Sequence, residues 1–182
     1  MKKETRLLAL LAILVASFSY QGASAQAELD KGNLLLNAGV GFGYYYAGGV
    51  SLNINAEYSV TPELGIGGYF AYTHWENDWG YAGNRYDIGY NFIDIGARAS
   101  YHFAKLFGVT NPNFDPYAGA FLGFVSSSND YDGAGYDDDD YDGGLRTGIH
   151  AGARYYFAPN FAGYGELGIG LSPLVLGVTL KL

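Results

Sequence analysis

The stretch VSLNINAEYSV, residues 50–60, alternates apolar and polar side chains without interruption. Its apolar set runs from Val50 through Leu52 and Ile54 to Val60, and Ser, Asn and Glu residues stand between the members. Because successive side chains of a β-strand point to opposite faces, this pattern predicts a strand with one apolar and one polar face. The fold of the whole chain depends on which of these two faces is turned inward.

Seven further segments show the same alternation, and turn or loop residues separate them. Together with the opening stretch they predict eight strands, at 33–46, 50–60, 64–74, 86–103, 116–126, 145–157, 161–171 and 173–182. In the fourth segment the apolar parity changes between Phe92 and Ile93. We predict a β-bulge at that point, because one inserted residue would restore a single apolar face.

The polar faces of these strands decide between a soluble barrel and a membrane barrel. A face in bulk water normally carries Lys and Glu freely, whereas these faces carry mostly Gly, Asn, Ser and Thr. Small residues suit the interior of an eight-stranded barrel, which is only wide enough for side chains to fill. The apolar faces continue for about 9–11 residues, the length of a tilted membrane strand. We therefore predict a closed eight-stranded antiparallel up-and-down transmembrane β-barrel, with the apolar face toward lipid.

Aromatic residues mark both ends of the apolar band, as bilayer interfaces favour. They are Tyr44, Tyr46, Tyr72, Trp75 and Tyr86 near the long loops, and Tyr58, Tyr101, Phe103, Tyr155, Phe157 and Phe161 near the short turns.

The first 25 residues are predicted to be a cleaved signal peptide. Basic residues precede an apolar run that is too short to span a bilayer comfortably, and Ala-Ser-Ala at 23–25 offers small residues to a signal peptidase. An uncleaved N-terminal anchor is the alternative. The mature barrel domain would then be 26–182, and it has no Cys from which to form disulfides.

The chain is acidic, with a formal net charge of −8 and no basic stripe, which argues against nucleic acid as a partner. Much of this charge falls in one loop, at Asp130, Asp132, Asp137, Asp138, Asp139, Asp140 and Asp142. Carboxylates suit Ca²⁺, but the EF-hand spacing is missing. We favour a solvated surface loop, with cation binding or bridging to lipopolysaccharide phosphates as the alternative, and we assign no metal site and no cofactor.

Three segments carry a family resemblance: AEYSVTPELGIGGYFAY at 56–72, PYAGAFLGF at 116–124 and LVLGVTLKL at 174–182. With the signal peptide, they resemble the small eight-stranded outer-membrane β-barrels of Gram-negative bacteria, the OmpA-like, OmpX-like and opacity-type barrels. The resemblance implies a place in the cell outer membrane, with both termini in the periplasm and the long loops 75–85 and 126–144 outside. Family members typically end in an aromatic residue that assists assembly, whereas this chain ends in Leu182.

Four charged residues are predicted to meet inside the barrel: Glu57, Arg98, Arg154 and Glu166. Counted from the short turns along tilted strands, they fall within about 5 Å of one another in height. The sequence therefore predicts a lumenal ion-pair cluster, from which removal of one partner would cost about 3–5 kcal/mol. The cluster is either a gate to a narrow solute path or a satisfied polar core, and we favour the core.

The function expected is a structural or cell-surface interaction role, among outer-membrane lipids and lipopolysaccharide, with an extracellular ligand or a host surface as candidate partner. A narrow passive pore, or a transporter for small solutes or hydrophobic molecules, is the alternative. We expect no enzyme, because the three histidines at 74, 102 and 150 are scattered and no nucleophile motif accompanies them. The sequence does not define an oligomeric state.

Overall fold

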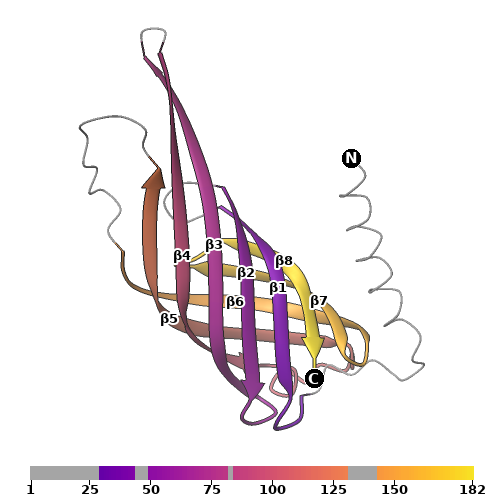
Figure 1. Cartoon of the computed structure of the whole chain (residues 1–182). Helices are drawn as coiled ribbons and strands as arrows, with labels where there is room; N and C mark the ends of the chain where they lie inside the picture. Colours follow the sequence, from indigo (N-terminus) through magenta and orange to yellow (C-terminus); the bar gives the residue numbers. More distant parts are fainter. Residues whose placement is uncertain (1–28, 44–48, 82–83, 131–142) are drawn as a thin grey trace.

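Eight strands form a closed barrel in which each strand is antiparallel to its neighbours in the chain, and β1 closes against β8 (Figure 1). The computed structural model describes residues 29–43, 49–81, 84–130 and 143–182, so the predicted signal peptide lies outside the described residues. The strands are β1 (Leu34–Phe42), β2 (Val50–Ser59), β3 (Leu64–Tyr81), β4 (Asn84–His102), β5 (Phe114–Asp130), β6 (Gly144–Ala158), β7 (Phe161–Ile169) and β8 (Leu174–Lys181). The predicted eight-stranded antiparallel barrel is confirmed.

Within the described ranges, no helix is both long enough and apolar enough to cross a membrane.

The apolar face of the strands is turned outward. On β2, the exposed fraction is 58% for Leu52 and 57% for Ile54, but only 6% for Asn55 and 0% for Glu57. A soluble barrel would bury the first pair and expose the second, because burial of apolar surface drives folding in water. The barrel therefore has a polar interior at this strand and a continuous apolar outer surface, which we call the outer belt.

The predicted β-bulge at Phe92–Ile93 is wrong. β3 and β4 pair without a register shift, with Tyr72 opposite Ile93 and Thr73 opposite Phe92. Phe92 is 3% exposed and lies inside, whereas Ile93 is 44% exposed and lies on the outer belt. The apolar parity changes because this level of the lumen accepts apolar side chains, among them the buried Val125 of β5.

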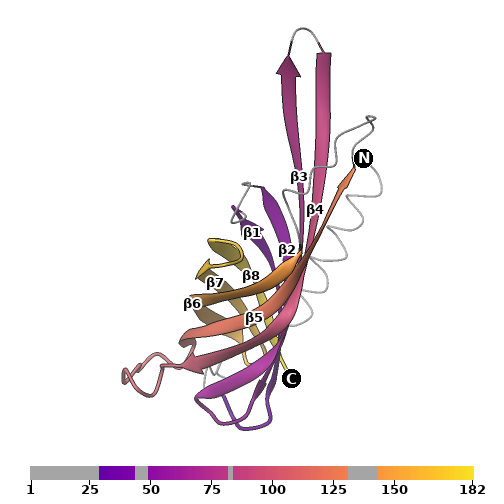
Figure 2. The ribbon, with the colours of Figure 1, turned by 90° about the vertical axis from the view of Figure 1, so that its left-hand side faces the viewer.

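Much of the predicted loop at 75–85 is strand. The pairing of β3 with β2 stops at His74, which lies opposite Val50, the first residue of β2. Beyond that point β3 pairs with β4 as far as Tyr81 opposite Asn84. This hairpin stands well above the rest of the barrel (Figures 1 and 2). Its Trp and Tyr residues favour extended structure, which accounts for the continued pairing.

The second predicted loop, 126–144, also begins as strand, because β5 continues to Asp130 and pairs it with Gly89. The other six aspartates of the acidic loop, from Asp132 to Asp142, lie outside the described residues.

The opposite end of the barrel carries the connections 60–63, 103–113 and 159–160, and we call it the turn end. The two ends of the barrel chain meet there, since the backbones of Leu34 and Leu182 exchange hydrogen bonds of 3.0 and 2.8 Å.

Candidate functional site: a lumenal ion-pair network

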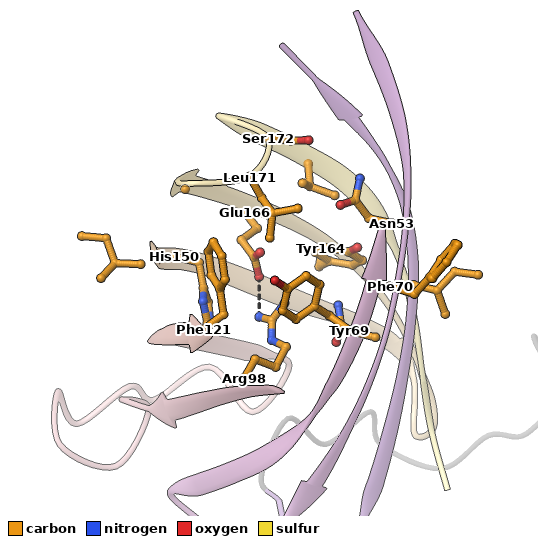
Figure 3. A pocket seen from close by; sticks show the side chains of 15 residues that line it. Asn53, Tyr69, Phe70, Arg98, Phe121, His150, Tyr164, Glu166, Leu171 and Ser172 are labelled. Atoms are coloured by element: carbon orange, nitrogen blue, oxygen red, sulfur yellow. Dashed lines mark hydrogen bonds and ion pairs between the residues drawn. The ribbon is translucent and has the colours of Figure 1, made fainter. Parts of the chain in front are cut away.

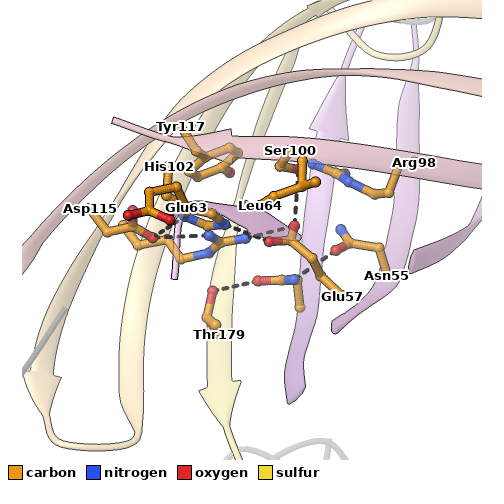
Figure 4. Close-up of polar contacts among 12 residues, drawn as sticks. Asn55, Glu57, Glu63, Leu64, Arg98, Ser100, His102, Asp115, Tyr117 and Thr179 are labelled. Carbon is orange, nitrogen blue, oxygen red and sulfur yellow. Dashed lines mark hydrogen bonds and ion pairs between the residues drawn. The ribbon is translucent and has the colours of Figure 1, made fainter. Parts of the chain in front are cut away.

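Four buried charged side chains from four strands meet near the turn end of the lumen (Figure 4). Arg154 of β6 donates from Nη1 to Asp115 Oδ2 at 3.1 Å and from Nη2 to Glu57 Oε2 at 3.4 Å. His102 of β4 lies between the same two carboxylates, with Nδ1 2.8 Å from Asp115 Oδ1 and Nε2 2.7 Å from Glu57 Oε1. We call Glu57, His102, Asp115 and Arg154 the turn-end cluster.

The hydrogen bonds of His102 define the charge balance of this cluster. An ionised carboxylate only accepts hydrogen bonds, so a ring between two carboxylates satisfies both when each of its nitrogens donates. With His102 doubly protonated, two positive charges face two negative charges. None of the four side chains is more than 4% exposed, so this balance matters, because an unpaired charge in such a place is expensive.

A second ion pair lies further from the turn end. Arg98 Nη2 is 2.8 Å from Glu166 Oε2 (Figure 3). Tyr117 donates its hydroxyl to the same oxygen at 3.0 Å. The guanidinium carbon of Arg154 stacks 4.2 Å above the centre of the Tyr117 ring. We call Arg98 and Glu166 the mid-lumen pair, and Tyr117 connects it to the turn-end cluster.

Ser100 and His150 extend the turn-end cluster through Glu57. The Ser100 hydroxyl donates to Glu57 Oε2 at 3.0 Å and lies 3.1 Å from His150 Nε2. Both side chains are buried inside the barrel, at 1% and 5% exposed.

Two smaller polar groups lie elsewhere in the described lumen. Arg146 Nε lies 3.6 Å from Asp94 Oδ1, and its Nη1 donates to the carbonyl of Gly170 at 3.2 Å. At the junction of β1 with β2 and β8, two hydrogen bonds join uncharged side chains of the three strands. Thr179 of β8 donates to Asn37 of β1, and Asn37 donates to Asn55 of β2, both at 2.6 Å.

Aromatic rings fill much of the space that the charges leave. Tyr69 and Phe121 pack edge to face with ring centres 5.3 Å apart. A cavity of about 30 Å³ lies beside these rings and the mid-lumen pair (Figure 3). That volume holds about two water molecules. The described part of the lumen is therefore a packed interior at this level.

The sequence matches no protein-family model and no curated protein. Solved structures do match the fold. The outer membrane protein OprG of Pseudomonas aeruginosa superposes with a TM-score of 0.62 at 11% identity, covering 86% of this chain and 99% of OprG. The N-terminal β-barrel domain of Pseudomonas aeruginosa OprF gives 0.54 at 16% identity, covering 85% and 100%. The chain has the fold of the small eight-stranded outer-membrane β-barrels.

A third match places this fold in lipid. The outer membrane protein Ail of Yersinia pestis, whose backbone structure was determined in a phospholipid bilayer nanodisc, gives a TM-score of 0.52 at 15% identity, covering 83% of this chain and 99% of Ail. At these identities the likeness is one of fold, so it carries no residue roles from those outer-membrane barrels to this one.

The four lumenal residues named from the sequence all lie inside the barrel. Arg98 is paired with Glu166, and Arg154 is paired with Glu57. The two salt bridges are separate, and Tyr117 connects them. The acidic-loop candidate cannot be placed in the same way, since most of that loop lies outside the described residues.

Sequence reasoning missed two members of the turn-end cluster. Asp115 was assigned to the connection 104–115, whereas β5 begins at Phe114 and turns Asp115 inward. The sequence-based prediction includes His102 only as one of three scattered histidines. Its parity with Arg98 and Ser100 on the same strand was the signal that could have placed it in the lumen.

Proposed function

We propose that this chain is an integral outer-membrane barrel with a structural or surface-interaction role, and that its lumen does not conduct solutes. The observation that carries the proposal is the packing at mid-lumen, where a buried ion pair and aromatic rings leave a cavity of about 30 Å³. The larger hollow of about 390 Å³ lies at the turn end, between the connections 60–63 and 103–113, and His102 and Asp115 line it. The outer belt and the likeness in fold to outer-membrane barrels support the membrane placement. By the same proposal the termini are periplasmic, and the β3–β4 hairpin lies outside the cell.

The experiment that tests the packed lumen is conductance in planar bilayers. We expect the purified barrel to be electrically silent. A variant with Tyr69→Ala and Phe121→Ala removes the two rings beside the cavity and should increase conductance, whereas Leu122→Ala on the outer belt should not. Steady, ion-selective openings of the unmodified protein would instead establish the pore that we regard as the alternative.

We propose no catalytic role for the Ser100–His150 contact. A serine beside a histidine is the first requirement of a nucleophile. Here Ser100 is 1% exposed, its hydroxyl is engaged by Glu57, and the adjoining cavity is too small for a substrate. His150 Nδ1 makes no hydrogen bond within the described residues, so no acid orients the ring.

The surface-interaction part of the proposal concerns the β3–β4 hairpin. Its backbone pairing continues for seven residue pairs beyond the last contact of β3 with β2, from Trp75–Tyr90 to Tyr81–Asn84. A structural barrel needs no such extension, which supports an interaction outside the membrane. Replacing residues 77–88 with an Asn-Gly turn should leave the barrel folded and reduce adhesion of expressing cells to protein-coated or polysaccharide-coated surfaces. Unchanged adhesion to both would remove the surface role and leave the structural one.

A further inference from the structure

The connection between β4 and β5 begins with a turn of defined geometry. The N–H of Phe107 donates to the carbonyl of Phe103 at 2.9 Å, which closes one helical turn. Val109 then donates to Ala104 at 2.9 Å and Gly108 to Lys105 at 3.3 Å, the hydrogen-bond pattern of a Schellman cap. Gly108 has a φ of +60°, which suits glycine at this position. The segment is thus a built element at the turn end, and Figure 2 shows it projecting from the ends of β4 and β5.

This turn presents two large apolar side chains to its surroundings. Leu106 is 65% exposed and Phe107 is 68% exposed. The Phe107 ring stacks on Phe103, with ring centres 5.1 Å apart and planes at 12°. Phe103 in turn lies 5.0 Å from Tyr101, which belongs to the outer belt. We call Leu106, Phe107 and Phe103 the turn patch, and it is continuous with the surface that faces lipid in the proposed placement.

Neighbouring strands extend the same aromatic surface. Phe114 of β5 is paired with Tyr155 of β6, and both are partly exposed on the outer belt. Tyr155 and Phe157 lie with ring centres 5.5 Å apart, and Phe157 is 68% exposed. The turn patch therefore extends an aromatic surface that follows β4, β5 and β6 around the turn end.

The polar residue of the turn suits a membrane interface. Lys105 lies between Phe103 and Leu106 of the turn patch, and its side chain is 81% exposed with Nζ 2.8 Å from Glu63 Oε1. Aromatic rings and a lysine at one level are the residues that anchor proteins at the boundary between headgroups and acyl chains. The connection 60–63 at the same end has no such apolar pair, since its exposed residues are Thr61 and Pro62.

We propose that the turn patch is a lipid-binding anchor that inserts Leu106 and Phe107 into the leaflet at the turn end. The barrel then sits deeper in the membrane on its β4–β6 side than at the connection 60–63. This inference rests on the proposed membrane placement, and under that placement the lipid is the phospholipid of the periplasmic leaflet.

Tryptophan quenching in reconstituted vesicles tests the anchor. The natural Trp75 and Trp79 are replaced by Phe, and one new tryptophan is introduced at a time as Phe107→Trp, Thr110→Trp or Leu122→Trp. Leu122 on the outer belt is the membrane reference, and exposed Thr110 in the same connection is the aqueous reference. Phosphatidylcholine vesicles carry lipids brominated at graded depths, and iodide is the aqueous quencher. We expect brominated lipid to quench Phe107→Trp several-fold more than Thr110→Trp, and iodide to do the reverse.

The three sites separate failure of the anchor from failure of the membrane placement. If Phe107→Trp responds to iodide like Thr110→Trp while Leu122→Trp still responds to brominated lipid, the anchor is overturned and the placement stands. If Leu122→Trp does not respond to brominated lipid, the placement itself fails. Protection of Phe107→Trp from both quenchers would show a protein cover, such as a second copy, and would also overturn the anchor. Leu106→Trp gives a second reporter if Phe107→Trp does not fold, as judged by circular dichroism.

Discussion

The turn-end cluster and the mid-lumen pair hold charge at two levels of one lumen, with different numbers of partners. In the turn-end cluster, Arg154 contacts two carboxylates and is 1% exposed. In the mid-lumen pair, Arg98 contacts one carboxylate, and that carboxylate is 12% exposed beside a small cavity. The cost of losing a buried charge depends on how many partners it leaves unpaired and on how easily water can reach them. The two groups should therefore respond differently to the same kind of substitution.

The largest effect is expected for Arg154→Leu. The substitution leaves Glu57 and Asp115, which are 0% and 1% exposed, with only His102 between them. The free energy of unfolding should fall by about 3–5 kcal/mol, as expected when one partner of a buried ion pair is removed. Urea unfolding in phospholipid vesicles, followed by circular dichroism, measures it.

A matched control is Lys31→Leu, which removes an exposed positive charge near the start of β1 and should leave stability nearly unchanged. Equal stabilities for Arg154→Leu and Lys31→Leu would show that the turn-end cluster contributes nothing to folding.

A smaller effect is expected for Arg98→Ala. Glu166 loses its cation but keeps the Tyr117 hydroxyl, and the adjoining cavity gives water a route to the carboxylate. The loss should be about 1–3 kcal/mol, the range for a buried polar group that loses a partner. The same urea unfolding experiment measures this loss. If Arg98→Ala lowers the free energy of unfolding more than Arg154→Leu does, the difference proposed between the mid-lumen pair and the turn-end cluster is wrong. Unchanged stability would discredit a stabilising role for the mid-lumen pair.

The barrel topology could be predicted from the sequence because alternation depends only on local geometry. β2 needs no distant information to show one apolar and one polar face. The polar faces of the strands taken together, mostly Gly, Asn, Ser and Thr, predict that this face is turned inward. The charged positions followed from the same parity. Glu57, Arg98, Arg154 and Glu166 could be placed in the lumen by counting from the turns, although counting could not show which cation meets which carboxylate.

The remaining features depend on packing between strands, which alternation does not report. Phe92 lies inside because the lumen at that level accepts apolar side chains, so the parity rule alone called for a bulge that does not exist. Asp115 was missed because β5 begins with Phe114 and Asp115, next to Pro116, where turn signals and strand signals overlap. The sequence predicts a loop where the β3–β4 hairpin lies, because the polar residues there conceal the β-propensity of the aromatic ones.

A neutral polar group should give an effect below both charged ones. Thr179→Val keeps the shape of the side chain but removes the hydroxyl that donates to Asn37 at 2.6 Å. Asn37 is 2% exposed, so its oxygen loses a buried partner, and we expect a loss of about 1 kcal/mol in the unfolding experiment. Thr179→Ser, which keeps the hydroxyl, is the control and should retain that hydrogen bond. A loss as large as that of Arg154→Leu would mean that charge is not what distinguishes the turn-end cluster.

The smallest effect is expected outside the membrane, at the exposed salt bridge between Glu63 and Lys105. The hydrogen bond from Lys105 lowers the pKa of the Glu63 carboxyl below its ordinary value. A carboxyl with a lowered pKa in the folded state contributes stability above its unfolded pKa and loses that contribution as the pH falls through the folded value. Because both groups are exposed and screened by salt, the contribution of this salt bridge to the free energy of unfolding should be too small to separate from zero.

Lys105→Met should nevertheless raise the pKa of Glu63 toward its ordinary value, and a carbon NMR titration of the labelled carboxyl measures this. The control Lys31→Met should leave the pKa of Glu63 unchanged. A pKa unmoved by Lys105→Met would show that the ion pair does not persist at the turn end, and that Lys105 is available to lipid headgroups beside the turn patch.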